Sequence, residues 1–288
     1  RGAFRYGTGY LLTLPETLRV GKKTYRQTVN SFFMTDRPPK VEFVGPQSVI
    51  ERDSRQLLHV RAQNVNNLRF EGIRVPPLLL PLALAVEKSP VDWDRIFDEL
   101  KTASEGLKPL VASHKDLTDF VTPPLAEKQL FPAAGEKNKP WAVTLPLSFR
   151  QGQEAGALEL IRVQDNEAGS HAATPPRLFA ITNLGLTYKR SQQNLLLWVT
   201  SLKAGTPVAG ARIIGFTRDM EVFFLGRSNS DGVLLFESHD LAGLSLKNPK
   251  QLQPVKRVVN QDDLVLLMAG TGDDVAFIQL TPQSSLKP

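Results

Sequence analysis

The pattern of hydrophobic and polar residues changes character several times along the chain. Residues 9–14 and 28–34 form short, mostly apolar runs separated by a polar turn at 21–23. Such runs predict a couple of strands, too few to close a β-sandwich on their own. Prolines at 38–39 then interrupt the pattern and favour an extended linker. We therefore expect residues 1–37 to contain the C-terminal strands of a partial β domain and a linker.

A second β region begins at Val41. Residues 57–62 and 67–75 have the composition of strands, and the second run alternates between apolar and polar positions. Its change of phase at Gly72 predicts a β-bulge. The apolar run 75–86 contains three prolines. It is too short for a membrane-spanning helix, and we expect a buried extended segment leading into a loop.

Residues 89–121 predict a small helical insert. Positions 89–92, Ser-Pro-Val-Asp, are typical of a capping box with proline at the first helical position. Gly106 is the expected stop of the first helix, and Ser113 is the expected start of a shorter second helix. The first helix is identified by apolar residues at helical spacing, Trp93, Ile96, Phe97 and Leu100.

The β pattern returns after a segment that is rich in proline, lysine and glutamate. This segment, 122–140, is expected to be an exposed loop. Further strands are predicted at 142–149, 157–163 and 177–182. Together with the earlier strands they predict a β-sandwich over residues 38–183 that carries the helical insert.

The last hundred residues give the clearest all-β pattern. Turn sequences such as Ser-Asp-Gly at 230–232 separate short apolar runs. Their number suits a seven-stranded sandwich over residues 184–288. The predicted strands are 186–189, 195–200, 211–217, 222–226, 233–236, 264–268 and 275–280. The whole chain is thus expected to be all-β, with tandem antiparallel sandwiches of an immunoglobulin-like kind and one helical insert.

Composition narrows the classes of partner and cofactor. The chain has no cysteine, so a disulfide, a thiolate nucleophile and a cysteine-ligated metal are excluded within it. The net charge of +6 is spread over alternating basic and acidic residues, and no basic block with aromatics indicates nucleic-acid binding. No apolar segment predicts a membrane span. The sequence begins without methionine or a signal segment, which predicts an excised or processed part of a longer protein.

Candidate catalytic and metal-binding groups are sparse. The four histidines are scattered, and none has a second ligand at metal spacing. Ser-His-Asp at 238–240 cannot act as a triad, because adjacent residues do not converge on one another. The Asp pairs at 262–263 and 273–274 lack the order of a calcium loop, which favours turn capping. We therefore expect a protein that is not an enzyme and that has no cofactor and no metal site.

Two stretches resemble bacterial alpha-2-macroglobulins: ITNLGLTYKR at 181–190 and LLLWVTSLKAGTPVAGA at 195–211. In that family a DLGL entry is followed by LLVWVTSL, GKPVAGA and a Ser/Thr-Asp-x-Asp-Gly hairpin. Here Asn183 and Thr206 replace the usual Asp and Lys. Residues 37–41 and the strand ending at Val75 also look like the family's N-terminal region.

The resemblance implies that the sandwiches are macroglobulin-like domains and that the protein lies in the periplasm. It also implies that the protein traps proteases, as a mimic of host defence. The proteases would be partners of the full-length protein. Association with the inner membrane would then depend on parts outside this chain. Some relatives carry a Cys-x-Glu-Gln thioester, which this chain cannot contain because it lacks cysteine. The chain would be a non-catalytic structural and interaction segment. Its partners would be other domains of the same protein and envelope proteins.

Two alternatives remain open at the level of sequence. One is a surface stalk of sandwich repeats, and the other is an envelope scaffold that binds partner proteins without trapping proteases. The stripe Trp93, Ile96, Phe97 and Leu100 is the candidate partner contact. The competing interpretation is that this stripe covers the chain's own core, as helical apolar stripes usually do.

Overall fold

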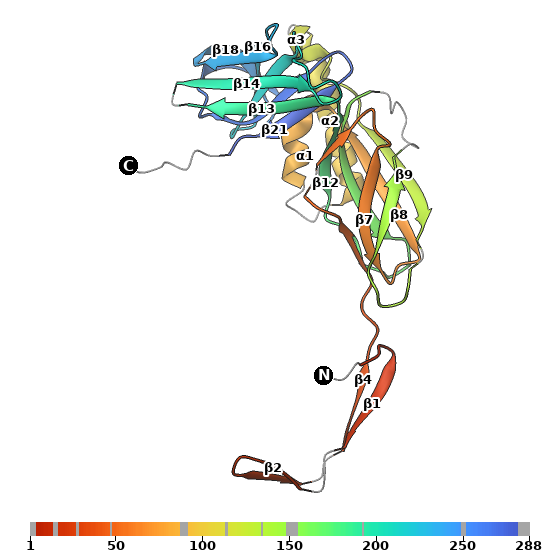
Figure 1. The fold of residues 1–288 in the computed structure, drawn as a ribbon. Coiled ribbons are helices and arrows are strands. Elements are labelled where there is room, and N and C mark those ends of the chain that lie inside the picture. Colours follow the sequence, from red (N-terminus) through yellow and green to blue (C-terminus); the bar gives the residue numbers. More distant parts are fainter. Residues whose placement is uncertain are drawn as a thin grey trace.

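The structure is a computed structural model in which strands predominate. It describes residues 4–13, 17–26, 29–46, 48–86, 92–112, 115–133, 135–147, 155–191, 193–248 and 252–281. Two β-sandwiches lie together, several helices lie beside them, and an N-terminal arm extends away (Figure 1). The prediction of an all-β fold with antiparallel sandwiches and a helical insert is confirmed.

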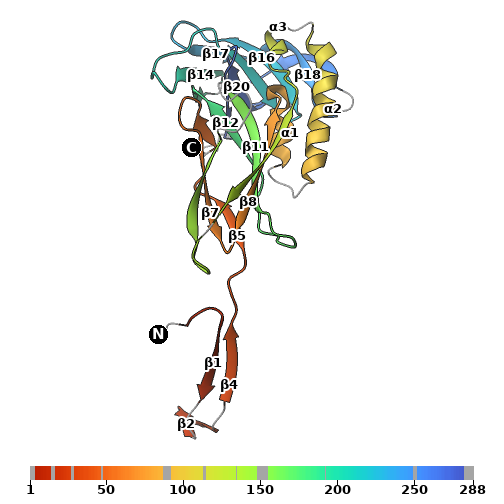
Figure 2. The same ribbon diagram turned by 90° about the vertical axis from the view of Figure 1, so that its right-hand side faces the viewer.

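The N-terminal arm, residues 4–36, consists of two nested hairpins instead of the single pair of strands expected. Its outer pair is β1 (Thr8–Thr13) with β4 (Val29–Met34), and its inner pair is β2 (Thr17–Val20) with β3 (Lys23–Arg26). Tyr10 stacks on Phe32 across the outer pair at a centroid distance of 5.4 Å. Figure 2 shows the arm extending from the end of the first sandwich that lies away from the second.

The first sandwich, residues 40–182, has a three-stranded and a five-stranded sheet. Strand order in the smaller sheet is β10-β7-β5, and in the larger it is β6-β12-β11-β8-β9. Apolar side chains between the two sheets form its core, including Val60, Phe70 and Ile181. The strands are β5 (Lys40–Phe43), β6 (Val49–Glu51), β7 (Leu57–Gln63), β8 (Asn67–Val75), β9 (Leu125–Pro132), β10 (Trp141–Pro146), β11 (Ala157–Asp165) and β12 (Arg177–Thr182).

The helical insert begins earlier than predicted. The run expected to be extended at 75–86 contains a 3₁₀ turn, η1 (Pro77–Leu79), and the helix α1 (Leu80–Val86). This expectation was wrong because Pro77 lies in the first turn of η1 and Pro81 in the first turn of α1. Backbone N–H groups in a first turn have no partner within the helix, so the missing N–H of proline costs no helical hydrogen bond there. Leu78, Leu79 and Leu80 are fully buried.

The main helix of the insert is α2 (Trp93–Val111), and a short helix α3 (Lys115–Thr118) follows. Asp92 caps α2, since its side chain accepts a hydrogen bond from the Asp94 backbone N–H. The predicted start at 89–91 and the cap at Ser113 lie outside the described residues. Gly106 does not end α2, contrary to expectation. Leu107 and Val111 continue the buried stripe, and their burial outweighs the roughly 1 kcal/mol that a helical glycine costs.

The second sandwich, residues 184–279, has nine strands in the described residues, whereas seven were predicted. The three-stranded sheet has the order β13-β14-β17, and the six-stranded sheet has the order β19-β18-β16-β15-β20-β21. The strands are β13 (Leu184–Arg190), β14 (Asn194–Ser201), β15 (Arg212–Thr217), β16 (Glu221–Arg227), β17 (Val233–Glu237), β18 (His239–Ser245), β19 (Gln253–Val259), β20 (Leu264–Gly270) and β21 (Val275–Gln279).

The two strands that sequence missed, β18 and β19, lie at one edge of the six-stranded sheet. They are partly exposed, and their sequences HDLAGLS and QPVKRVV contain little apolar alternation. The segment 122–140 was likewise expected to be a loop, but β9 occupies part of it. This strand pairs with β8 at the edge of its sheet and has mostly exposed side chains. Edge pairing in both cases leaves a weak hydrophobic signal.

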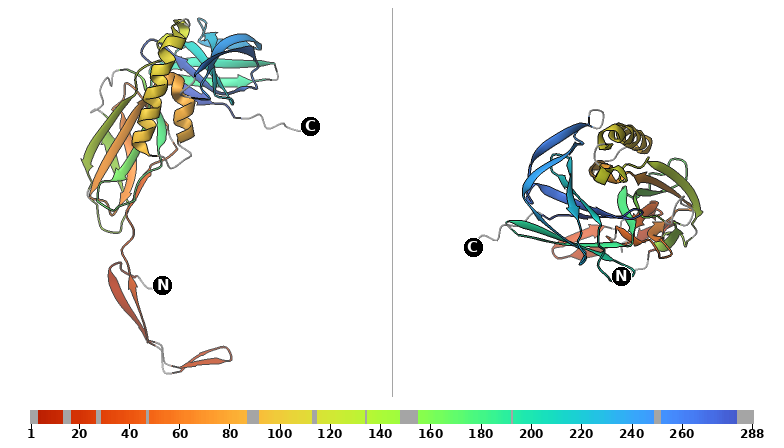
Figure 3. Two further views of the ribbon diagram at one scale, coloured as in Figure 1. Left: turned by 180° about the vertical axis from the view of Figure 1, so that it is seen from behind. Right: turned by 90° about the horizontal axis from the view of Figure 1, so that it is seen from above.

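One large core joins the helices to both sandwiches. It contains Leu100 and Leu107 from α2, Ile73 from the first sandwich, and Phe216 and Met268 from the second. The central strands of the five-stranded and six-stranded sheets are therefore buried on both faces. Each of these two sheets faces its own small sheet on one side and the helices on the other. Figure 3 shows the helices lying between the sandwiches when seen from behind.

This shared core also explains the change of phase that sequence placed at Gly72. The predicted β-bulge is absent, because β8 pairs with both neighbours without a register shift through this residue. Leu68 and Phe70 face the core of the first sandwich, whereas Ile73 and Val75 face the shared core. The strand thus changes its buried face, and the backbone stays regular.

Truncation of Leu107 to alanine tests the importance of the shared core. Leu107 is fully buried on α2, and a Leu→Ala change at such a site costs about 2–5 kcal/mol of unfolding free energy. Urea denaturation of L107A should show this loss. The exposed Lys101 of the same helix supplies the control, since K101A should change the unfolding free energy by no more than about 0.5 kcal/mol. Equal effects of the two variants would contradict the packing described.

Candidate functional site

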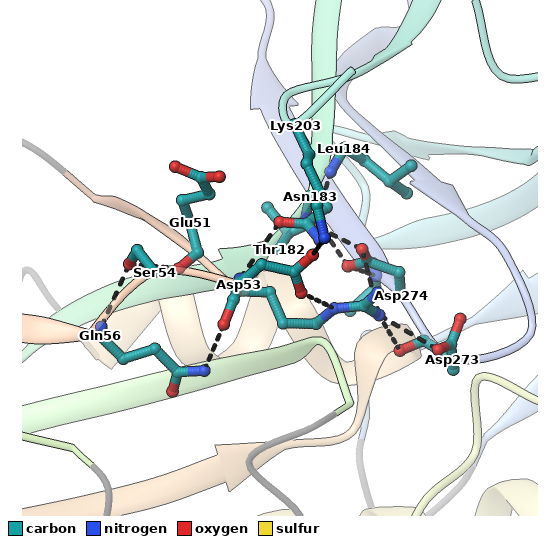
Figure 4. Close-up of polar contacts among 12 residues, drawn as sticks. Glu51, Asp53, Ser54, Gln56, Thr182, Asn183, Leu184, Lys203, Asp273 and Asp274 are labelled. Atoms are coloured by element: carbon teal, nitrogen blue, oxygen red, sulfur yellow. Dashed lines mark hydrogen bonds and ion pairs between the residues drawn. The ribbon is translucent and has the colours of Figure 1, made fainter. Parts of the chain in front are cut away.

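A single residue, Asn183, connects the two sandwiches. Strand β12 ends at Thr182, and β13 begins at Leu184. Polar side chains from both sandwiches gather around this connection (Figure 4). So short a link brings the edges of the two sandwiches together, and its buried backbone groups need hydrogen-bond partners.

Asp274 lies at the centre of this contact. It follows the turn between β20 and β21, and it is almost completely buried. Its Oδ1 accepts hydrogen bonds from the Thr182 hydroxyl at 2.6 Å and from the Val275 backbone N–H at 2.8 Å. Its Oδ2 accepts the Asn183 backbone N–H at 2.9 Å. One carboxylate of the second sandwich therefore binds the last strand of the first.

Arg52 reaches the same carboxylate from the first sandwich. Its Nη1 lies 3.1 Å from Asp273 Oδ2 and 3.4 Å from Asp274 Oδ2. Its backbone N–H donates to the Thr182 carbonyl at 3.1 Å. The Arg52 side chain is largely buried, so its charge has to be compensated by these carboxylates. We call Arg52, Thr182, Asn183, Asp273 and Asp274 the clasp.

A more exposed ion pair flanks the clasp. Lys203 Nζ of the second sandwich lies 2.8 Å from Asp53 Oδ2 of the first. This hydrogen bond with Lys203 is the main cause that lowers the pKa of Asp53, with a further contribution from Asn183, and it raises the pKa of Lys203. The Asp53 backbone N–H faces Asn183 Oδ1 at 3.4 Å. Asn183 therefore binds the second sandwich through its backbone N–H and the first sandwich through its side-chain oxygen.

The end of the helical insert makes a second contact with the second sandwich. Arg212 on β15 forms an ion pair with Asp119 at 2.7 Å, and its guanidinium lies 4.6 Å from the centroid of Phe120. Arg227 on β16 pairs with Asp116 of α3. Stacking of arginine on an aromatic ring adds to the ion pair when both are shielded from water. Asp119 and Phe120 line the same hollow as Asp273 and Asp274, so this contact lies beside the clasp.

The structure places the candidate partner stripe in the interior. Trp93, Ile96 and Leu100 are buried in the shared core, and Phe97 is partly buried against it. The Arg162 guanidinium of the first sandwich also lies over the Trp93 ring, 4.8 Å from its centroid. These side chains therefore contact domains of the same chain, and none of the three buried ones is accessible to a separate protein.

Sequence reasoning missed the clasp. The pair Asp273-Asp274 was noted, but turn capping was the favoured role, and Asp274 instead binds across to the first sandwich. Asp263 does cap its turn, because its Oδ2 accepts the Asn260 backbone N–H at 2.9 Å. Asn183 was noted as a departure from the family pattern. No local signal relates it to Asp274, since the two are far apart in sequence.

The polar groups of the clasp bind one another and the connecting strand. A hollow of about 360 Å³ opens beside the clasp, and it is lined by Arg74, Asp119, Phe120 and the turn 271–275 among others. In the part of the chain that the structure describes, His, Asp and Glu side chains nowhere gather in a group of three that could hold a metal. Within those same residues, no helix has the length and apolar character needed to cross a membrane.

Comparisons with known proteins identify the second sandwich. Residues 181–288 match the family model "Bacterial alpha-2-macroglobulin MG3 domain". This part of the chain is therefore similar to a domain of the bacterial alpha-2-macroglobulin family. The match extends the resemblance seen in sequence to the end of the chain. A search of curated proteins found no significant match.

Solved structures of bacterial alpha-2-macroglobulins share the fold over nearly the whole chain. Native Escherichia coli alpha-2-macroglobulin spanning domains MG0-NIE-MG1 covers 96% of this chain at 17% identity and a TM-score of 0.59, with 76% of that structure covered. The E. coli piece spanning NIE-MG1 covers 84% of this chain at 18% identity and a TM-score of 0.53, with 97% covered.

A third similar structure is Salmonella alpha-2-macroglobulin reacted with methylamine. It covers 96% of this chain at 17% identity and a TM-score of 0.56, and this chain spans 14% of it. At these identities the likeness shows the fold. The family model names its domain MG3, whereas the E. coli structures are named MG0, NIE and MG1. The two names place the matching domain differently in the series.

Replacement of Asp274 by alanine should weaken the contact strongly. The change leaves the Thr182 hydroxyl and the Asn183 N–H without their buried acceptor, while Arg52 keeps its ion pairs with Asp53 and Asp273. At about 1–3 kcal/mol for each unsatisfied buried group, we expect a loss of about 2–5 kcal/mol in unfolding free energy. The neighbouring D273A is the control, because the Asp273 side chain is mostly exposed and its ion pair contributes about 0–1 kcal/mol. Chemical denaturation of both variants measures the difference. A smaller loss in D274A than in D273A would refute the central role of Asp274.

The lowered pKa of Asp53 gives a prediction on pH. A carboxyl whose folded pKa lies below its unfolded value of about 3.9 stabilises the fold above that pH, and this stabilisation is lost as the pH falls through the folded pKa. Removing the cation in K203Q should raise the Asp53 pKa toward its ordinary value. Carboxyl carbon NMR titration measures it. K247Q, on an exposed lysine elsewhere, should leave it unchanged, and an unshifted Asp53 pKa in K203Q would rule out Lys203 as the cause.

Proposed function

We propose that this chain is a non-catalytic structural segment of a periplasmic alpha-2-macroglobulin-like protease inhibitor. The family match over residues 181–288 is the observation that carries the proposal. The fold likeness to alpha-2-macroglobulin structures over 96% of the chain supports it. Since the chain spans 14% of the Salmonella structure, protease trapping would be an activity of the full-length protein.

The mechanical role follows from the way the sandwiches are joined. In this proposal residues 38–183 and 184–288 are two macroglobulin-like domains that hold part of the frame around a captured protease. The stripe Trp93, Ile96, Phe97 and Leu100 serves as a contact between domains of this chain. A covalent step through a thioester would need a cysteine, which this chain lacks, so that step would occur in another part of the protein.

We also propose that this chain is not an enzyme. Catalysis needs a nucleophile or acid and a base that converge on one site. The polar groups that do converge, Arg52 with Asp273 and Asp274, bind one another and the connecting strand. Their donors and acceptors are used for contact between domains. We therefore propose a binding and support role for them.

The test is mass spectrometry on the full-length protein that contains this chain. The protein is measured with and without methylamine, before and after exposure to a broad-specificity protease. A methylamine adduct, together with protease that becomes covalently attached only in untreated protein, is the expected result for a thioester trap. The untreated protein without protease is the control.

The other outcomes are equally informative. Attached or enclosed protease without a methylamine adduct would support a trap that lacks a thioester. Absence of both adduct and captured protease would contradict the proposal. It would favour the envelope scaffold or surface stalk, in which the sandwiches bind partners without trapping a protease.

A further inference from the structure

We propose that the two sandwiches and the helical insert, residues 40–281, form a single rigid body, and that the clasp prevents rotation about their connection. The consequence for the full-length protein is specific: any rearrangement after protease attack would have to take place outside this unit. The inference rests on contacts within this chain and holds whether or not the protein traps proteases.

The connection between the two sandwiches lacks the freedom of a hinge. A hinge needs residues whose backbone can change conformation without losing bound partners. Asn183 donates its N–H to Asp274 Oδ2 at 2.9 Å, and its carbonyl accepts the Leu202 N–H at 2.6 Å. On either side of it, the Thr182 hydroxyl accepts the Leu184 N–H at 2.9 Å. Rotation at this residue would therefore break several buried hydrogen bonds at once.

The shared core holds the two sandwiches together through apolar contacts. Tandem domains that move independently usually meet through modest, rather polar interfaces. Here the five-stranded sheet, the helices and the six-stranded sheet contribute buried apolar residues to the same cluster. Leu160, Leu107 and Phe216 represent the three layers, and each is fully buried. Separating the sandwiches would expose this core to water, at a cost in free energy that grows with the apolar area exposed.

At two glycines, the backbone of one layer lies directly against a side chain of another layer. A Cβ added at Gly270 would lie 2.2 Å from the Phe120 ring, and one added at Gly156 would lie 2.2 Å from Asp274 Oδ1. The Gly156 N–H also donates to the Asp273 carbonyl at 2.7 Å. Glycine at these positions permits the turn 271–274 to fit against the other two layers.

The contacts extend across the six-stranded sheet. The clasp and the Phe120 contact hold the edge formed by β21 and its neighbour β20. Leu252, directly before β19 at the opposite edge, packs against the shared core, where a Cβ added at Gly106 of α2 would lie 3.4 Å from its Cδ1. A body fixed at one point can still rotate about it, whereas contacts at both edges of the sheet oppose such rotation.

The experiment measures the distance between the sandwiches. Because the chain has no cysteine, the exposed residues Ala142 and Lys256 can be changed to cysteine and spin-labelled, one on each sandwich. Double electron–electron resonance on the whole chain should give one narrow distance distribution. In D274A the distribution should broaden or gain a second, shifted population. D240A, at an exposed position of β18 outside the clasp, should keep the narrow distribution.

T182V provides a milder change if D274A does not fold, because it removes only the hydroxyl that binds Asp274. It should broaden the distribution in the same direction. Two populations, or a broad distribution, in the unmodified clasp would overturn the proposal of a rigid body. A narrow distribution that persists in both D274A and T182V would overturn the role of the clasp. Neither result depends on protease trapping, which the mass spectrometry tests separately.

Discussion

The burial of both faces of two β-sheets is the constraint on which the rest of this structure depends. A sandwich ordinarily leaves the outer face of each sheet to solvent. Here the helical insert covers one face of the five-stranded sheet and one face of the six-stranded sheet at the same time. The insert could not be removed without exposing apolar strands in both sandwiches. It is therefore part of the interior of the molecule.

The polar contacts follow from that packing. Once the two large sheets share a core, their neighbouring strands meet at Asn183, and the backbone there is withdrawn from water. Buried backbone groups need partners, which Asp274 and Thr182 supply. Arg52 balances the charge of the Asp pair. The polar contact therefore supports the joint that the shared core creates between the two sandwiches.

Sequence predicted the strand-rich class and the main helix because these depend on local periodicity. It missed features that depend on tertiary contacts. The helix at 80–86 was hidden by prolines, and β9 and β18 are edge strands with few apolar side chains. The apparent slip at Gly72 reflected a change of buried face, which a single strand cannot reveal. Asp274 could not be assigned to the clasp, since its partners lie about ninety residues away in sequence.

The most direct test of the shared core is the cooperativity of unfolding, followed by tryptophan fluorescence in each sandwich separately. Trp141 lies in the first sandwich and Trp198 in the second. Two variants, one keeping Trp141 alone and one keeping Trp198 alone, would each report urea unfolding, with circular dichroism as a common probe for both. If one core joins the sandwiches, the fluorescence midpoint should coincide with the circular dichroism midpoint in each variant. A fluorescence transition that precedes the loss of the remaining strand signal would show two independent domains and contradict the account.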